Sequence, residues 1–356
     1  MPAPGAMAPL DPALAAAARE ALTGWDLHVS HLGRLAGGLI NQSLLVENDA
    51  GTRFVLQKLH PVFAPEVNDN IDLVTSALAS RAAVTPRLVR TRAGQTWQRA
   101  GDAVWRLLTY IDGRSVDALQ TPGEAAAAGE LLGRFHALLA DWTDELPHAR
   151  ASVHVPARHF DALQAALAAH PGHRLHADVA RLAESVFVRA AALPPWPAAP
   201  LRLVHGDPKI SNLLFDLEGR GLCLVDLDTL ARGPLVPELG DAFRSWCNPG
   251  PEDAPHASFS MPQFEAALQG YAYHGRHFLT REERGALVAG VAAIYLELAA
   301  RFAADALNEG YFGWDAARFP SRGAHNLARA HNQWLAAEDL LRQQPAAEAV
   351  VERVLA

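Results

Sequence analysis

Three polar side chains near the middle of the chain have the types and the spacing that phosphoryl transfer requires. Asp207 and Asn212 lie in a loop between two short apolar segments predicted to be strands, and Asp226 ends the next strand pair. In this chemistry one carboxylate orients the acceptor hydroxyl and takes its proton, while an amide oxygen and a second carboxylate hold magnesium against the triphosphate. The residues therefore predict Asp207 as catalytic base and Asn212 and Asp226 as Mg2+ ligands, with ATP as co-substrate.

The neighbouring positions favour this interpretation over a plain turn. Asp and Asn often bond their own backbone in loops, which is the alternative for Asp207 and Asn212. Their separation, however, equals that in the kinase catalytic loop, H-R-D-x-x-x-x-N. Lys209 could steady the γ-phosphate as charge develops there, or it could be a solvated loop lysine. Asp228 could be a second metal contact, or a polar residue that faces the acceptor or the loop.

The first third of the chain is patterned as a sheet with one inserted helix. Alternating apolar and polar residues indicate strands at 28–36, 42–48 and 53–59, and two more strands flank a turn at 100–102. A helical pattern precedes this region up to about residue 25, and another lies at about 65–81.

The rest of the chain has a helical pattern, which begins with a capping box at Thr121–Glu124. Thr280–Glu283 repeats this arrangement ahead of a long helix through about Ala304. We therefore predict an α+β, protein-kinase-like two-lobed fold. Its parts are a small antiparallel-sheet N-lobe at 1–108, a hinge at 109–114 and a large, mainly helical C-lobe at 115–356 that carries a catalytic β insert.

Composition excludes several other classes of protein. A net charge of −8 argues against a nucleic-acid partner, because such binders neutralise phosphates with Lys and Arg. The two cysteines indicate reduced thiols, and the N-terminus lacks the basic start of a signal peptide. The apolar run 285–296 is too short to span a bilayer and predicts a buried helix. We expect a cytoplasmic protein with no membrane partner.

The stretches LVHGDPKISNLLFD and LCLVDLDTLARGPLVPELGDAFRSW resemble the aminoglycoside phosphotransferase and choline-kinase-like superfamily. Within it the resemblance is closest to the N-acetylhexosamine 1-kinases, which carry H-x-D-x-K-x-x-N, V/I-D-L-D-T and G-D-A/S-x-R segments. The matching residues are Asp207, Lys209, Asn212, Asp226, Asp228, Thr229, Gly240, Asp241 and Arg244. The resemblance implies Asp207 as base and Asn212 and Asp226 on magnesium, with Asp241 and Arg244 bracing the loop. It extends from about Ala36 to Gln333.

The N-lobe carries the residues expected to contact ATP. Lys58 ends a strand and would hold the α- and β-phosphates. The resemblance implies that Asp69 is the acidic partner of Lys58, with Glu66 as the alternative. It also implies that Gly38 and Asn41, in a glycine-containing loop, contact ATP. Asn41 could serve the sugar instead of ATP. Position alone predicts adenine contacts from the connector residues, which are Thr109, Tyr110 and Ile111.

The resemblance also implies residues that would contact the acceptor. Arg301 and Tyr311 match an R-F…Y-F segment with a spacing one residue shorter, and His154 loosely matches an F-H position. The segment around His325 matches H-N-L-x-R-A. For each, a satisfied helix or loop polar residue is the alternative. Three histidines spaced three apart, at 170–176, could hold zinc, but no Cys or acidic residue is patterned beside them, so exposed loop histidines are favoured.

The function predicted from these observations is ATP- and magnesium-dependent phosphorylation of a sugar hydroxyl, with C1 of an N-acetylhexosamine as the expected position. An alternative with the same fold is a kinase of another small alcohol, namely an aminoglycoside, choline, homoserine or methylthioribose. An alternative of another class is an inactive binding module of the pseudokinase type. Such modules usually lack a base or metal residue, whereas Asp207, Asn212 and Asp226 are all present.

Overall fold

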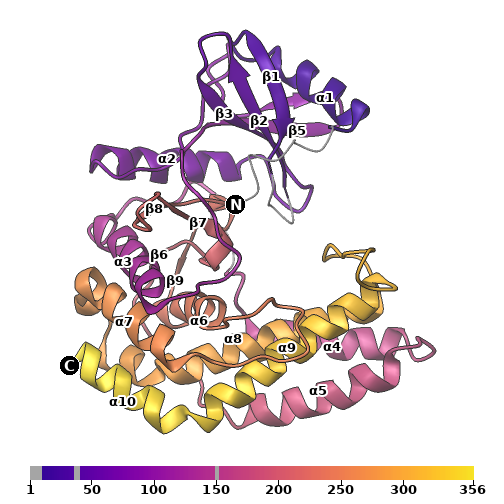
Figure 1. Ribbon diagram of the computed structural model, residues 1–356, viewed down its shortest axis with the longest axis vertical. Coiled ribbons are helices and arrows are strands. Elements are labelled where there is room, and N and C mark those ends of the chain that lie inside the picture. The colour runs from indigo at the N-terminus through magenta and orange to yellow at the C-terminus, as the bar shows by residue number, and fades with distance from the viewer. Residues whose placement is uncertain (1–9, 36–40, 149–151) are drawn as a thin grey trace. The chain divides into compact units, whose positions relative to one another are not determined.

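The computed structural model describes residues 10–35, 41–148 and 152–356 and divides the chain into two compact units (Figure 1). One unit comprises Met1–Asp112 together with Glu145–Ala149, and the other comprises Gly113–Asp144 and Arg150–Ala356. The first is built on an antiparallel sheet and is called the sheet unit below. The second is mainly helical and is called the helical unit. The predicted α+β, protein-kinase-like fold, with a small sheet lobe and a larger helical lobe, is confirmed.

The sheet unit contains a five-stranded antiparallel sheet in the order β1-β2-β3-β5-β4. The predicted hairpin turn at 48–51 joins β2 to β3, and Gln42 pairs with Lys58 at its open end. Two helices accompany the sheet. The elements are α1 (Pro12–Leu22), β1 (Val29–Arg34), β2 (Gln42–Asn48), β3 (Arg53–Lys58), α2 (Val67–Ser80), β4 (Gln98–Ala100) and β5 (Ala103–Thr109).

The alternation of apolar and polar residues along the strands produces the core of this unit. Every second residue of a strand faces the same side, so the apolar set of β2, β3 and β5 is buried together against α1. Trp25 follows α1 and is buried, and its indole N–H donates to the Val89 carbonyl at 2.8 Å. The buried cluster consists of Ala18, Ala21, Leu22, Trp25, Leu44, Val46, Leu56, Trp105 and Leu107.

The helical unit carries a small β insert at one end (Figure 1). Both predicted capping boxes are present, at Thr121 with Glu124 and at Thr280 with Glu283. The helices are α3 (Pro122–Leu138), α4 (Pro156–Ala169), α5 (His176–Ala191), α6 (Leu235–Trp246), α7 (Met261–Gly275), α8 (Arg281–Asn308), α9 (Arg322–Arg342) and α10 (Gln344–Leu355). The insert consists of β6 (Arg202–Val204) paired with β9 (Ala231–Gly233), and β7 (Leu213–Phe215) paired with β8 (Gly221–Leu224). Short 3-10 turns are η1 (Ile210–Asn212), η2 (Leu227–Thr229) and η3 (Arg276–Phe278).

Helix α8 is the centre of the helical unit. It packs against α4, α5, α6, α9 and α10, which is why its apolar residues extend around the helix and do not form one stripe. Among the described helices α8 alone has the length and hydropathy of a membrane span, but 78% of its most apolar window is buried inside the protein. The predicted buried helix is therefore confirmed, and it runs four residues past the predicted end.

Helices α3 and α7 approach each other through glycine. A Cβ atom placed at Gly129 would lie 1.9 Å from the Ala267 carbonyl oxygen, and one placed at Gly270 would lie 2.0 Å from that of Ala126. No side chain fits at either distance, so this close crossing depends on the absence of a side chain.

We predict that Gly129→Ala destabilises the protein. Helix propensity alone would favour alanine by about 1 kcal/mol, but the new methyl group must push α3 from α7, at a net cost of about 2 kcal/mol. Urea unfolding of both variants measures this, with Gly285→Ala in α8 as the control, because nothing lies within 4 Å of that position. Equal stabilisation of the two variants would show that the helices can separate at no cost.

Candidate active site

The predicted catalytic loop joins β6 to β7 and is closed by a small set of buried hydrogen bonds. The imidazole of His205 donates from Nε2 to the Val225 carbonyl at 2.9 Å, and the Thr229 hydroxyl donates to the His205 carbonyl at 2.8 Å. Gly206 has a φ of +82°, and a Cβ atom there would lie 2.4 Å from the Thr229 carbonyl oxygen. Both facts require glycine immediately before Asp207.

A buried glutamate of α6 holds the backbone of this loop. The N–H groups of His205 and Gly206 donate to the two carboxylate oxygens of Glu238, each at 2.9 Å. Nε2 of His136 lies 3.4 Å from the same carboxylate, and its Nδ1 is 3.1 Å from the Tyr271 hydroxyl. Burial raises the pKa of Glu238, but the neighbouring His136 and His205 imidazoles and the Gly206 N–H outweigh it and lower that pKa.

The side chain of Asp207 is held at one oxygen. The Asn212 amide donates to the Asp207 carbonyl at 2.9 Å and to its Oδ2 at 3.2 Å, and the Lys209 ammonium forms an ion pair with the same Oδ2. No hydrogen bond from a described residue reaches Oδ1. Asp207 can therefore receive a hydroxyl proton at Oδ1 while Oδ2 is held in place.

The electrostatics keep Asp207 ionised. Burial raises the pKa of this carboxyl, but the charge and hydrogen bond of Lys209 outweigh burial and lower the pKa to about 2. The same pairing raises the pKa of Lys209, because the charges of Asp207 and Asp226 outweigh the effect of burial. At neutral pH the pair consists of a carboxylate and an ammonium. Lys209 is therefore not a freely solvated loop lysine.

The predicted metal ligands are brought together by the β7–β8 hairpin. The Val225 N–H donates to the Asn212 carbonyl at 2.9 Å, which places Asp226 immediately beside Asn212. Asp226 has left-handed backbone angles (φ 62°, ψ 54°), a conformation that only Asp, Asn and Gly adopt readily. The Asn212 amide nitrogen faces Asp207, so its oxygen points elsewhere. An amide oxygen and a carboxylate fit the hard-oxygen preference of Mg2+. Asp228 lies in η2 and is 1% exposed.

In the sheet unit, Lys58 and Asp69 have different surroundings. Lys58 ends β3, half-buried, and forms no ion pair with a described residue. The carboxylate of Asp69 instead lies 3.0 Å from Nε2 of His148 and 3.5 Å from the Thr96 hydroxyl. His148 belongs to the returning segment Glu145–Ala149, and its backbone makes two hydrogen bonds to the Asn70 side chain. Nothing in the sequence indicated this docking.

The remaining predicted nucleotide contacts lie along the ends of strands. Asn41 precedes β2 and its amide oxygen accepts the His60 N–H at 2.9 Å. The hydroxyl of Thr109, at the end of β5, accepts the Arg87 N–H at 2.9 Å, and Tyr110 and Ile111 follow it, half-buried. Glu66 is the cap residue of α2. Gly38 lies outside the described residues.

The predicted acceptor residues lie in the helical unit. Arg301 of α8 lies 3.9 Å from Glu297, one turn earlier, and its guanidinium sits over the Phe312 ring. Tyr311 is 50% exposed in the loop after α8, where the buried Asp305 carboxylate accepts three successive N–H groups, those of residues 310–312. His154 precedes α4 and is buried.

Sequence reasoning missed the residues of α6 that support the loop. Besides Glu238, the Ser245 hydroxyl accepts the Ile210 N–H and the Trp246 indole donates to the Pro208 carbonyl, each at 2.9 Å. One signal was available. Glu238 is a lone charge among apolar neighbours in LVPEL, and a buried charge requires partners.

The three spaced histidines do not converge on a metal. His170 contacts Asn308 at 3.0 Å, His173 contacts Glu309 at 3.3 Å, and His176 contacts the Leu167 carbonyl at 3.2 Å. Each ring is engaged in holding the α4–α5 turn. Within the described residues no group of three or more His, Cys, Asp or Glu side chains is arranged to hold a metal ion.

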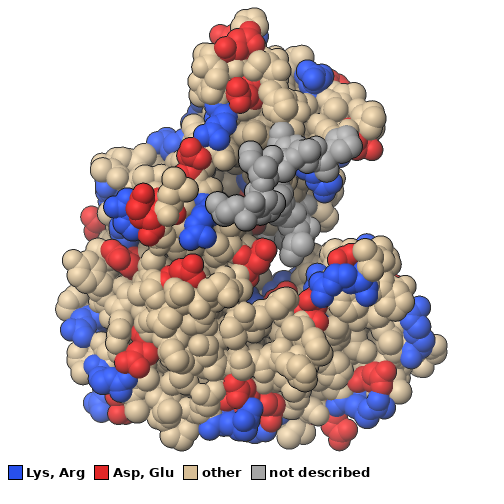
Figure 2. All heavy atoms as spheres, in the orientation of Figure 1, with Lys and Arg blue, Asp and Glu red and all other residues tan. Residues whose placement is uncertain are grey.

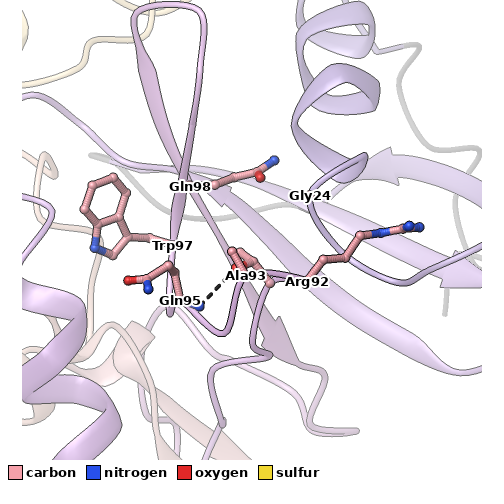
Figure 3. A pocket seen from close by; sticks show the side chains of 7 residues that line it. Gly24, Arg92, Ala93, Gln95, Trp97 and Gln98 are labelled. Carbon is pink, nitrogen blue, oxygen red and sulfur yellow. Dashed lines mark hydrogen bonds between the residues drawn. The ribbon is translucent and has the colours of Figure 1, made fainter.

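A separate pocket of about 360 Å3 lies in the sheet unit and is distinct from the catalytic loop. In Figure 3 the side chains of Trp97 and Arg92 point away from each other, and the Arg92 guanidinium is engaged with the Trp25 carbonyl and Asp26. The residues that line the pocket are Gly24, Thr91, Arg92, Ala93, Gln95, Trp97 and Gln98.

Comparison with known proteins identifies a family and several solved structures that are similar to this chain. The model of the phosphotransferase enzyme family (APH) matches residues 31–319. Solved structures with a similar fold include an amicoumacin kinase in complex with AMP-PNP, Ca2+ and Ami, at a TM-score of 0.63 and 14% identity over 94% of both chains. A microcompartment-associated aminopropanol kinase has a TM-score of 0.64 and 17% identity, covering 95% of this chain and 99% of that one. A choline/ethanolamine kinase family protein from Mesorhizobium loti has a TM-score of 0.54 and 21% identity, covering 96% and 99%.

We predict that Lys209→Met moves the acid limb of the pH–rate profile to higher pH. Without the ammonium, the largest effects that oppose burial are lost and only the weaker ones of His205 and Arg244 remain, so the pKa of Asp207 rises from about 2 and the carboxylate is protonated at a less acidic pH. The maximal rate should also fall by about 10²-fold. Steady-state rates from pH 4 upward test this, with the exposed Arg220→Met as control. An unshifted acid limb would mean that Asp207 does not control that limb.

We also predict that Glu238→Gln costs about 3 kcal/mol of stability, because it removes a buried charged acceptor and turns an amide N–H toward a backbone N–H. Urea unfolding measures the cost, and kcat/KM should fall as the catalytic loop loosens. Glu184→Gln on the exposed face of α5 is the matched control. If the two variants unfold alike, Glu238 does not anchor the loop.

Proposed function

The chain belongs to the phosphotransferase enzyme family and is a small-molecule kinase, and from this premise we propose that it transfers the γ-phosphoryl group of ATP to a sugar hydroxyl. The observation that carries the proposal is the asymmetric hold on Asp207. Lys209 and Asn212 occupy Oδ2, and Oδ1 is left for the acceptor. Asp226 stands beside Asn212, where hard-oxygen donors are needed.

Asp207 orients the acceptor and receives its proton. The acceptor hydroxyl donates to Oδ1, its oxygen forms a bond to phosphorus, the bond from phosphorus to the β-phosphate oxygen breaks, and ADP leaves. In a loose transition state the hydroxyl loses its proton late, so a carboxylate with a low pKa suffices. Asp207 therefore acts first as a positioning acceptor and then as a base.

Cationic side chains and the metal ligands complete the machinery. Lys209 lies against the base and would stabilise charge on the transferred group. Lys58 would hold the α- and β-phosphates, and Thr109, Tyr110 and Ile111 would contact adenine. Asn212 and Asp226 would hold Mg2+, which when bound neutralises the phosphate charge. Lys58 and Lys209 are the chain's only lysines, so both fall on proposed phosphate contacts.

A neutral acceptor is supported by the charges of the helical unit. Asp241 is paired with Arg244, and Glu297 lies beside His154 and Arg301, so these carboxylates are already neutralised. On the face drawn in Figure 2 acidic and basic side chains are interspersed and do not form one acidic region. Polycationic aminoglycosides would favour such a region. We propose an N-acetylhexosamine phosphorylated at C1, with Asp228, Asn41, His154, Arg301 and Tyr311 as acceptor contacts.

A small amino alcohol is the second candidate acceptor. The similar structures include kinases named for aminopropanol and for choline or ethanolamine. Their identity to this chain is too low to carry a substrate across, so the comparison indicates only that the fold can serve such acceptors.

The test is an ADP-release screen with ATP and Mg2+ against N-acetylglucosamine, N-acetylgalactosamine, kanamycin, choline, ethanolamine, homoserine and methylthioribose. Phosphorus NMR of the product identifies the phosphorylated position. If only an acceptor other than a sugar is phosphorylated, the sugar assignment is wrong, but the assignment of kinase activity stands.

In the same assay, Asp207→Asn should lower the rate by about 10²-fold or more while ATP still binds. The exposed Asp161→Asn on α4 is the control for the loss of a carboxylate. Unchanged turnover by Asp207→Asn would refute its role as the base.

A further inference from the structure

Three ionisable side chains meet inside the helical unit, where α4 and α6 both pack against α8. His154 comes from the loop before α4, Asp241 from α6 and Glu297 from α8, and all three are buried. Nδ1 of His154 is 3.0 Å from Glu297 Oε1, and its Nε2 is 3.9 Å from Asp241 Oδ2. We call these three residues the His154 cluster.

Each member of the His154 cluster has one buried polar atom without a hydrogen-bond partner among the described residues. These atoms are Nε2 of His154, Oδ2 of Asp241 and Oε2 of Glu297. An unsatisfied buried polar atom costs about 1–3 kcal/mol, and three so close together require an explanation such as a water or a ligand.

The other polar atoms of the cluster have charged partners, which restrain the three carboxylate and imidazole groups. Oδ1 of Asp241 accepts from Arg244 at 2.7 and 3.0 Å, and Oε1 of Glu297 has His159 at 3.6 Å and Arg301 at 3.9 Å. The side chains of His159 and Arg301 are 19% and 18% exposed, so these two neighbours of Glu297 reach solvent while Glu297 itself does not.

The cluster is electrostatically coupled to the catalytic loop. Burial lowers the pKa of Lys209, but the charges of Asp207, Asp226 and Asp241 outweigh it. The charge of Asp241 therefore acts on the ion pair of Asp207 and Lys209. Asp241 belongs to the G-D-A-x-R segment of α6, the helix that also supports the catalytic loop. The sequence assigned Asp241 only to bracing the loop, yet half of its carboxylate is not used for that purpose.

The charge state of His154 follows from its neighbours. Burial lowers its pKa, but the hydrogen bond to Glu297 and the charges of Asp241 and Glu297 outweigh both burial and the opposing charge of Arg301, and raise that pKa. His159 also faces the cluster, and burial lowers its pKa. The neighbours of His154 thus favour its imidazolium form, which carries an N–H donor at Nε2.

We infer that the His154 cluster binds neighbouring hydroxyl groups of a neutral, polyhydroxylated acceptor. One hydroxyl accepts from His154 Nε2 and donates to Asp241 Oδ2, and a second donates to Glu297 Oε2. An ammonium group does not fit, because His154, Arg244 and Arg301 already neutralise both carboxylates. The inference rests on the proposed function and deepens it by assigning Asp241 and Glu297 to acceptor recognition.

A binding measurement tests the inference independently of catalysis. Protein labelled with [15N]histidine is titrated with N-acetylglucosamine and with ethanolamine at pH 7, and the His154 ring signals are assigned by their loss in His154→Asn. We expect an imidazolium whose Nε2 signal shifts with the sugar and not with ethanolamine. A shift with ethanolamine alone overturns the inference. If no ligand shifts the signal although the enzyme phosphorylates the sugar, the cluster holds internal water only and the inference also fails.

Two substitutions separate recognition from folding. Asn at position 154 can retain the bond to Glu297 but lacks an equivalent of Nε2, whereas Gln places an N–H near Nε2. We expect His154→Asn to raise the KM for N-acetylglucosamine by about tenfold and to leave the KM for ATP unchanged. The KM of His154→Gln for N-acetylglucosamine should lie between those of His154→Asn and the unmodified protein. His170→Asn, in the α4–α5 turn, is the control. Equal loss in both position-154 variants, with lowered thermal stability, would indicate a structural role and overturn the inference.

The two proposals can fail separately. Absence of phosphorylation of every acceptor removes the proposed function, while a sugar-induced shift of the His154 signal would still support the binding site. If only an amino alcohol is phosphorylated and N-acetylglucosamine does not shift the His154 ring signal, the inference is wrong but the protein is still a kinase. The sign of the pH effect is a further check. Because the pKa of His154 is raised, its imidazolium persists to a higher pH than that of an ordinary histidine, and acceptor binding should weaken as the pH rises through the raised pKa.

Discussion

The bond between the Glu238 carboxylate and two consecutive backbone N–H groups is the constraint on which the catalytic loop depends. The N–H groups of His205 and Gly206 are buried and need acceptors, because an unpaired buried backbone donor is costly. Glu238 supplies both acceptors from inside α6, and the same helix binds the loop again through Ser245 and Trp246. The base is thus held by a rigid helix of the core, and not by its own flexible segment.

The charges at the loop are paired. Glu238 lies in the interior with His136 and His205, Asp207 pairs with Lys209, and Asp241, a member of the His154 cluster, pairs with Arg244. Each carboxylate has a cationic or N–H partner, which is how buried charges are tolerated. Asp241 and Glu297 of the His154 cluster each keep one carboxylate oxygen without a hydrogen-bond partner among the described residues, and a buried oxygen of this kind requires an explanation.

Much of the fold was predictable from local patterns. The hairpin of β2 and β3, the helix α2 and both capping boxes follow from period-two alternation and from Thr–Glu spacing, which depend only on neighbouring residues. The returning segment Glu145–Ala149 was not predictable, since its bonds to Asn70 and Asp69 join residues far apart in the chain and leave no periodic pattern. The same reason hid Glu238, whose partners lie more than thirty residues earlier.

The sequence by itself determined the chemistry of the catalytic loop, because the residue types and the spacing of Asp207, Lys209 and Asn212 lie within one short segment whose geometry is local. Tertiary structure alone decided which oxygen of Asp207 is left for the acceptor, which carboxylate holds the loop, and that His154, Asp241 and Glu297 meet. These are consequences of helix packing. A sequence specifies which side chains can form a buried charge pair, but only the crossing of α4, α6 and α8 determines which of them come within a hydrogen bond of each other.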